Sequence, residues 1–370
     1  MNSNHYRSIE GAPSLFLDAL RFGASLVVFF YHARGIWFPD EVPNAKLPGD
    51  EAHTAVVVFF VLSGYVISYT TVNRNKGALK YFQARLGRLY SVLLPGLLFS
   101  IFVEFCLYYV NPPIYQQCTR GNTLVRYVLT SSFLNEIWFF SAAPPINGPL
   151  WSLSYEFWYY VIFGLWVYAQ STWKAKLASL IACLIAGPKI LLMMPIWLMG
   201  VYAYKIPAPS LNKNLAWGII ILLAFILGIL YQWLPPYPAQ LGYAPLFFSA
   251  QFLTDYILGI VVALSLWILP EGRELDLPKK SLQIFRDVAD LTFPIYVLHN
   301  PLLHLFRGVF GYLENNQKQL NQAMGTVILL CAIIGYFLNK YRPYWVLFFG
   351  RILKYLKLKG IVKARILQAH

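Results

Sequence analysis

Apolar segments alternate with short basic stretches along the chain, and most of these segments have the length of a membrane-crossing helix. Such a helix needs about 20 mostly apolar residues. The pattern predicts about ten spans, at residues 15–38, 53–72, 89–110, 150–169, 178–193, 194–206, 215–234, 243–268, 292–310 and 323–340. The fifth and sixth meet near Pro188 and Pro195, so they form either a helical hairpin or one broken span. The expected fold is an all-α, polytopic membrane bundle of about ten transmembrane helices.

The composition supports a membrane protein and excludes other classes. Hydrophobic residues make up 58% of the 370 residues and charged residues only 12%, whereas soluble domains carry about 25% charged residues. These values exclude a disordered chain, and only 4 cysteines exclude a disulfide scaffold. The stretch 124–140 is less apolar because it contains Arg126, Asn135 and Glu136, so we expect an interfacial helix or loop there.

The net charge of +14 could indicate a nucleic-acid partner, but the basic residues lie between the apolar segments. With ten spans, 22 of the 30 Lys and Arg residues fall on one side of the membrane and 7 on the other, while Arg21 lies within the first span. Lys and Arg concentrate in cytoplasmic loops, so both termini are predicted to be cytoplasmic, and no nucleic-acid partner is expected. The expected location is the bacterial inner membrane. Residues 1–341 would form the transmembrane domain and residues 342–370 a basic amphipathic tail on the lipid surface.

The first span carries three ionisable residues, Asp18, Arg21 and His32. Such groups are costly in hydrocarbon, which makes them candidates for function. Arg21 and His32 are eleven positions apart, so a helix places them on one face, about 16 Å from each other along the axis. A structural interpretation remains, in which Arg21 pairs with Asp18 and His32 bonds to a backbone carbonyl. The shared face favours a functional role.

Arg85 and Arg88 lie at the entry to the third span, in a region without acidic residues. Their i, i+3 spacing puts them on one face of a helix, and guanidinium groups bind phosphate well. Anchoring on the cytoplasmic side explains the pair equally well. Ser63 lies in the second span next to Gly64, where small residues allow close helix packing.

The fourth span begins with aromatic residues and then carries Glu156. We expect Glu156 about two turns below the outer surface, at the same depth as His32. A carboxylate at that position would orient the imidazole. An alternative is a glutamate solvated at the level of the lipid headgroups.

The ninth span contains His299 and Asn300 directly before Pro301. Because proline frees backbone carbonyls in a helix, His299 either satisfies one of them or lines a substrate passage. The sequence has no HExxH or CxxC metal motif, and we expect no metal and no tightly bound cofactor.

Five motifs resemble, in order, those of the acyltransferase 3 family of membrane enzymes, which O-acylate cell-surface glycans and some secondary metabolites. The motifs are LDALRFGASLVVFFYHA, FFVLSGYVI, YFQARLGRLYSVLLP, GPLWSLSYEFWYY and LTFPIYVLHNPLL. The chain departs from the family pattern at Ala19 and Tyr65, where Gly and Phe are common. The resemblance implies ten or so spans and an acyl-CoA donor on the cytoplasmic side. It also implies a member without the soluble hydrolase-like domain that some relatives carry.

The resemblance further implies roles for individual residues. Arg21, Arg85 and Arg88 would bind acyl-CoA, with acetyl-CoA expected. His32 would act as general base or as an acyl relay, and Glu156 matches the acidic position of the fourth motif. The acceptor would be a hydroxyl of a cell-surface glycan or a lipid-linked sugar. We expect the pore or acceptor passage to be lined by Ser63, Trp151, Ser152, His299 and Asn300.

Two other classes of function compete with acyl transfer. A secondary transporter or flippase would use the buried Arg, His and Glu residues as a proton relay. Transporters usually contain paired broken helices, and the sequence offers one broken segment near Pro188. A glycan-binding or assembly protein without chemistry of its own would tolerate the loss of His32. Of these three functions, only acyl transfer consumes acyl-CoA, so a measurement of acyl-CoA consumption distinguishes it from the other two.

Overall fold

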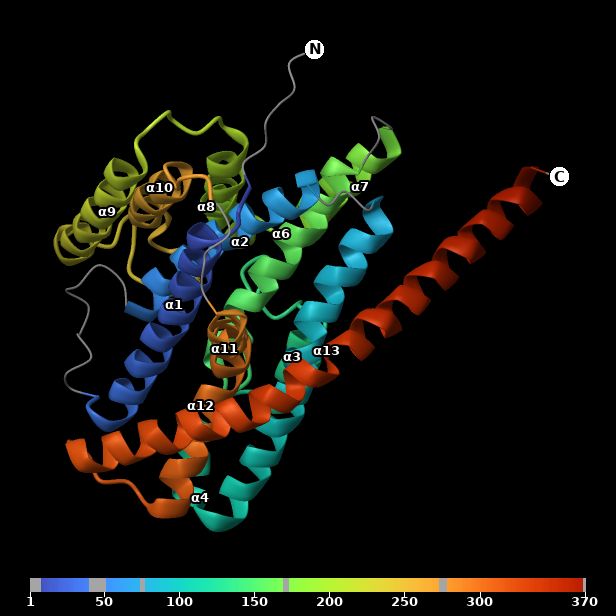
Figure 1. Cartoon of the computed structure of the whole chain (residues 1–370). Helices are drawn as coiled ribbons and strands as arrows, with labels where there is room; N and C mark the ends of the chain where they lie inside the picture. Colours follow the sequence, from blue (N-terminus) through green and yellow to red (C-terminus); the bar gives the residue numbers. More distant parts are fainter. Residues whose placement is uncertain (1–7, 40–50, 74–76, 169–172, 273–277, 369–370) are drawn as a thin grey trace.

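The computed structural model describes residues 8–39, 51–73, 77–168, 173–272 and 278–368, and every regular element within these ranges is helical (Figure 1). The elements are α1 (Ala12–Trp37), α2 (Glu51–Asn73), α3 (Gly77–Val110), α4 (Pro112–Cys118), α5 (Thr123–Ser131), η1 (Gly148–Leu150), α6 (Trp151–Val167), α7 (Trp173–Ala186), α8 (Pro188–Lys205), α9 (Lys213–Trp233), η2 (Phe247–Ser249), α10 (Phe252–Trp267), α11 (Lys279–Asp290), α12 (Thr292–Phe310) and α13 (Gln317–Gln368). The predicted all-α class is confirmed. Five residues of the charge count lie outside the described ranges: Arg7, Lys46, Arg74, Lys76 and Arg273.

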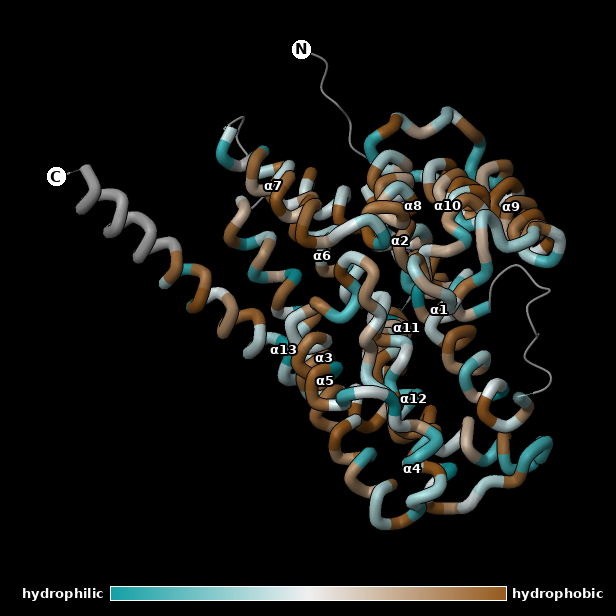
Figure 2. The backbone as a smooth tube through the Cα atoms, turned by 180° about the vertical axis from the view of Figure 1, so that it is seen from behind, coloured by the Kyte–Doolittle hydropathy of each residue, from teal (hydrophilic) through white to brown (hydrophobic). Residues whose placement is uncertain are grey.

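Five described helices are long and apolar enough to cross a membrane, namely α1, α2, α3, α9 and α13. The chain is therefore a multi-pass integral membrane protein. The predicted count of about ten spans is not confirmed. Two of the predicted spans, α6 and α10, have 17 and 16 residues, which is shorter than the typical length of about 20. Exposed apolar side chains lie along α9, for example Ile221 and Phe225, and Figure 2 shows the hydrophobic stripe of this helix. These side chains form a lipid-facing surface.

The weak fifth and sixth spans are two helices, α7 and α8, which bend by 118° at a break of at most four residues. Gly187 occupies the break with φ +81, a backbone conformation that glycine adopts without strain. A Cβ atom at this position would lie 2.6 Å from the backbone of Trp138. The sequence left open a helical hairpin or one broken span, and the structure shows two helices joined at a sharp bend. If this pair is taken as one span, the number of candidate crossings rises to six.

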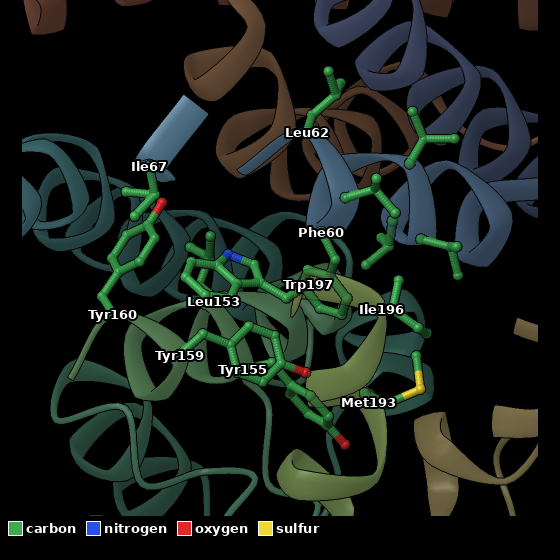
Figure 3. Close-up of a cluster of buried hydrophobic side chains, with 14 of the residues drawn as sticks. Phe60, Leu62, Ile67, Leu153, Tyr155, Tyr159, Tyr160, Met193, Ile196 and Trp197 are labelled. Atoms are coloured by element: carbon green, nitrogen blue, oxygen red, sulfur yellow. The ribbon is translucent and has the colours of Figure 1, made fainter. Parts of the chain in front are cut away.

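Helices α2 and α8 cross at a contact between two glycines. A Cβ on Gly64 would lie 1.9 Å from the carbonyl oxygen of Trp197, and a Cβ on Gly200 would lie 1.9 Å from that of Val61. The absence of side chains at both positions lets the two backbones touch. Aromatic rings fill the space around the crossing (Figure 3), including Phe60, Tyr155, Tyr159 and Trp197.

The segment between α5 and α6 combines buried polar residues with exposed aromatic ones at 138–140. Only residues 124–131 of the predicted interfacial stretch are helical. Beyond them, Asn135, Glu136 and Asn147 are fully buried. Glu136 accepts a hydrogen bond of 2.8 Å from the ammonium group of Lys189, and both side chains are 0% exposed. The segment enters the bundle because its polar groups find buried partners.

Helix α13 continues without a break through Pro343 to Gln368, so residues 342–368 extend the helix of the last span. Its middle part packs against α3. The amide of Gln83 donates to the carbonyl of Val346 at 2.9 Å. A Cβ atom on Gly87 would lie only 2.6 Å from the side chain of Val346, so the glycine allows the close approach of the two helices. The amphipathic tail at 342–370 stays a prediction beyond this contact.

Candidate functional site

Two cavities lie along the same side of α1. The larger one, of about 820 Å³, contains Arg21 among its lining residues and is called the Arg21 cavity here. The smaller one, of about 410 Å³, contains His32 and is called the His32 cavity. Val56 of α2 and Tyr296 of α12 line both. The predicted shared face of Arg21 and His32 therefore borders two adjoining chambers.

The Arg21 cavity is rich in guanidinium groups. Arg21 donates to the carboxylate of Asp18 at 3.0 Å, as the structural interpretation of the sequence expected, and its Nε is buried without a hydrogen-bond partner. Arg88 of α3 and Arg286 of α11 line the same cavity. Arg286 was not predicted as a site residue. The amphipathic pattern of residues 279–290, directly before a span, is the signal that could have indicated it.

Arg85 does not line the Arg21 cavity, although it is predicted to act with Arg88. Its guanidinium donates to the hydroxyl of Thr70 at 2.9 Å and lies 5.8 Å from the centroids of the Tyr81 and Tyr160 rings. Residues three apart differ in direction by about 60° around a helix. That difference turns Arg88 toward the cavity and Arg85 toward the aromatic rings.

Glu156 and Ser63 belong to one hydrogen-bonded group in the wall of the Arg21 cavity. The carboxylate of Glu156 accepts from the hydroxyl of Ser63 at 3.1 Å and from the hydroxyl of Tyr160. The indole of Trp197 donates to Ser63 at 3.2 Å. The expected contact between Glu156 and His32 is absent from these described bonds, and the two residues line different cavities.

The segment before α6 lies inside the bundle. The prediction counts two turns down from an outer surface at the start of the fourth span. In the structure Pro149 and Leu150 are already buried. The amide of Asn147 donates to the carbonyl of Val297 at 2.9 Å, inside the bundle. Glu156 lines the Arg21 cavity and His32 lines the other one, so a common depth of the two residues stays a prediction.

His32 is half-buried on α1, and its Nδ1 lies 2.7 Å from the carbonyl oxygen of Val28. This contact puts the ring proton on Nδ1, so Nε2 is the nitrogen that can accept a proton. The ring of His299 lies 5.2 Å away, centroid to centroid. His299 itself is fully buried, contacts the carbonyl of Ile295 through Nδ1 at 2.9 Å, and lines neither cavity.

The other predicted lining residues divide between the cavities. Trp151 and Asn300 line the His32 cavity, and Ser152 lines the Arg21 cavity. The hydroxyls of Ser152 and Tyr296 share a hydrogen bond of 2.7 Å, and Tyr296 donates to the carbonyl of Pro149 at 2.9 Å. These bonds hold the tyrosine ring at the boundary between the chambers.

The sequence analysis missed a histidine–carboxylate pair in the wall of the His32 cavity. His53 lies 2.9 Å from the carboxylate of Asp255 through Nε2, and both side chains are buried. The ring of His53 stacks on Trp151, with centroids 5.7 Å apart and planes at 14°. The two partners are 202 positions apart in the chain, so no local pattern could reveal them.

Cys118 and His304 form a second polar contact in the His32 cavity, with Sγ 3.5 Å from Nδ1. Cys118 ends α4, outside the membrane-spanning helices. Burial raises the pKa of its thiol, so the thiol form predominates at neutral pH. No group of three or more His, Cys, Asp or Glu residues capable of holding a metal occurs within the described ranges.

Comparisons with known proteins show that the chain is similar to acyltransferases. A family model described as "Acyltransferase domain" matches residues 14–339. The chain is 26% identical over 259 residues to "Acyltransferase MdmB" of Streptomyces mycarofaciens, covering 68% of this chain and 57% of the relative. It is 25% identical over 202 residues to an "O-acetyl transferase" of Shigella phage Sf6, covering 49% and 56%. The chain thus spans somewhat more than half the length of these relatives, and no solved structure matches it.

Proposed function

The chain belongs to this acyltransferase family, and from that premise we propose that it transfers an acyl group from acyl-CoA to a hydroxyl of a glycan or lipid-linked sugar. Acetyl is the expected group, since one relative is named an O-acetyl transferase. The donor would enter the Arg21 cavity from the cytoplasm, and the acceptor would enter the His32 cavity from the other side. The bacterial inner membrane is the proposed location.

The adjoining cavities are the observation that carries this proposal. Arg21 and His32 are eleven residues apart on one helix, and the helical rise separates them by about 16 Å. The extended pantetheine arm of CoA has a comparable length. A CoA phosphate held by Arg21 and Arg88 would therefore bring the thioester to the boundary at Tyr296, within reach of His32.

His32 is the proposed base in this arrangement. Nε2 of His32 takes the proton of the acceptor hydroxyl, whose oxygen attacks the thioester carbonyl. A new C–O bond forms, the C–S bond breaks, and the proton passes to the departing thiolate. The alternative is an acyl-imidazole on His32, which the acceptor then attacks. In both routes Glu156, with Tyr160 and Ser63, acts on the donor side of the boundary.

The same two cavities are the one feature that favours a transporter or flippase instead. Chambers that meet at Val56 and Tyr296 resemble two halves of a passage. A transporter would move its substrate without consuming acyl-CoA. Release of free CoA, coupled to ester formation on the acceptor, therefore separates the two functions.

The test uses the purified full chain in lipid nanodiscs with labelled acetyl-CoA and candidate sugars. We expect His32→Ala to abolish ester formation while its melting temperature stays near that of the wild type. His304→Ala is the matched control, because it removes an imidazole from the same cavity and should leave transfer measurable. Normal transfer by His32→Ala would remove His32 from the mechanism.

A further inference from the structure

The His32 cavity is lined by basic side chains. Arg120 and Arg307 face it together with three imidazoles, those of His32, His53 and His304. Among its described lining residues there is no aspartate or glutamate. A chamber with two guanidinium groups and no carboxylate in its described wall creates a positive potential that favours anions.

Neither arginine forms an ion pair within the described structure. Arg307 donates to the side-chain oxygen of Gln117 at 2.9 Å and lies 4.1 Å from the centroid of the Tyr312 ring. Its Nε is buried without a hydrogen-bond partner. Arg120 forms no ion pair with a described carboxylate, and its guanidinium lies beside Gly148 at the start of η1. Both charges therefore remain uncompensated by these contacts.

Three buried carboxylates of the bundle are already engaged by other groups. Asp255 binds His53 and Gln251, Glu136 binds Lys189 and Ser141, and Glu104 accepts from Tyr127. The ammonium group of Lys189 offsets the charge of Glu136, and none of these three carboxylates lines the cavity. The free positive charge of the chamber is thus available to a ligand.

Two features of the wall suit a sugar that carries the negative charge. Gly148, Pro149 and Trp151 bring the N-terminal end of η1 and α6 to the cavity, and a helix N-terminus adds positive potential. Trp151 stacks on Phe248, with centroids 4.3 Å apart, and both line the cavity. Trp151 is also stacked against His53, so Phe248 is the ring that would pack against the apolar face of a sugar. A volume of about 410 Å³ lies in the range of small-ligand sites.

We propose that the acceptor is an anionic sugar, which carries a carboxylate or phosphate group that Arg120 and Arg307 bind. The hydroxyl that receives the acyl group then faces His32. This inference rests on the proposed function, and it adds the chemical class of the acceptor. The negative charge could belong to the sugar itself, as in a uronic acid, or to a phosphate that links the sugar to a lipid.

The test measures binding of three soluble probes to the full chain in nanodiscs: methyl glucuronide, glucose 1-phosphate and methyl glucoside. Saturating CoA is present throughout, so that the Arg21 cavity is occupied and cannot bind the anionic probes. We expect at least one charged probe to bind about tenfold or more tightly than methyl glucoside. Comparison of the glucuronide with the phosphate identifies the source of the charge.

Three variants assign the preference to the cavity. Arg120→Gln and Arg307→Gln should each reduce the charged-over-neutral ratio about fivefold or more. Arg126→Gln is the matched control, because Arg126 donates to the carbonyl of Ala143 at 3.0 Å and does not line the cavity. Unchanged CoA affinity in each variant shows that the protein is folded.

The proposal is overturned if neither charged probe binds better than methyl glucoside, or if the preference survives in both cavity variants. Failure of the proposed function has a different signature. In that case the charged probe binds with the expected preference, but no sugar ester forms and no CoA is released from acetyl-CoA. Ester formation on the neutral glucoside with equal efficiency would retain the acyltransferase and exclude the anionic acceptor.

Discussion

Replacement of Arg88 by alanine tests the donor site most directly, because Arg88 lines the Arg21 cavity and Arg85 does not. A charge-assisted hydrogen bond to a phosphate contributes about 1–3 kcal/mol. Since each 1.4 kcal/mol changes Kd tenfold, Arg88→Ala should weaken binding of an acyl-CoA about 5- to 150-fold.

Arg85→Ala is the matched control for this experiment. Its guanidinium binds Thr70 and lies over two tyrosine rings, so its removal should cost stability rather than donor affinity. One lost internal hydrogen bond corresponds to about 1 kcal/mol of unfolding free energy. We expect a lower melting temperature and a change in Kd of less than about threefold, within the reach of long-range electrostatics.

The assay is calorimetric titration of a non-hydrolysable acyl-CoA analogue into each variant, at low and at high salt. Salt screens exposed charges, so the gap between wild type and Arg88→Ala should narrow as salt rises. His32→Ala should bind the analogue like the wild type. The reasoning is refuted if Arg85→Ala loses as much affinity as Arg88→Ala, or if Arg88→Ala loses none.

Three further predictions concern packing, the buried ion pair and the second histidine pair. Gly64→Ala should lower the melting temperature markedly, by an overpacking cost of about 1–3 kcal/mol, whereas Gly23→Ala, with nothing within 4 Å of the new Cβ, should not; equal melting would contradict the close crossing. Lys189→Met should destabilise the protein by about 3–5 kcal/mol because it leaves the Glu136 carboxylate buried and unpaired, and adding Glu136→Gln should restore most of the loss in a double-mutant cycle. Asp255→Asn should lower kcat/KM for the acceptor but leave the donor Kd unchanged, since the histidine it binds lines only the acceptor cavity; a changed donor Kd would argue for a general structural role.

The sequence is informative about properties that depend on one segment at a time. Apolar length predicts α1 and α9 to within three residues, as 15–38 against 12–37 and 215–234 against 213–233. The face shared by Arg21 and His32 follows from helical geometry alone, and both residues border cavities on the same side of α1. Local periodicity therefore suffices for these features.

Features that depend on how segments meet could not be predicted. Glu136 and Lys189 are separated by 53 positions in the chain. His53 and Asp255 are separated by 202 positions. Glu156 lines the Arg21 cavity beside Ser63, a partner 93 positions away that apolar length does not reveal. Spacing of three residues places Arg85 and Arg88 near each other, but the neighbours of the helix decide which of them reaches the cavity.

Tyr296 has a consequence for the energy stored across the membrane. Its ring and Val56 border both chambers, so in the proposed arrangement they would separate the two sides of the membrane, which are at different electrical potential. One elementary charge that crosses 100 mV releases about 2.3 kcal/mol, and a continuous column of water here would let protons dissipate that gradient. The thioester arm of acyl-CoA would pass beside the ring of Tyr296 without opening a continuous path for water. A cell that expresses the protein with Tyr296→Ala should accordingly leak protons, and its cytoplasmic pH should follow that of the medium.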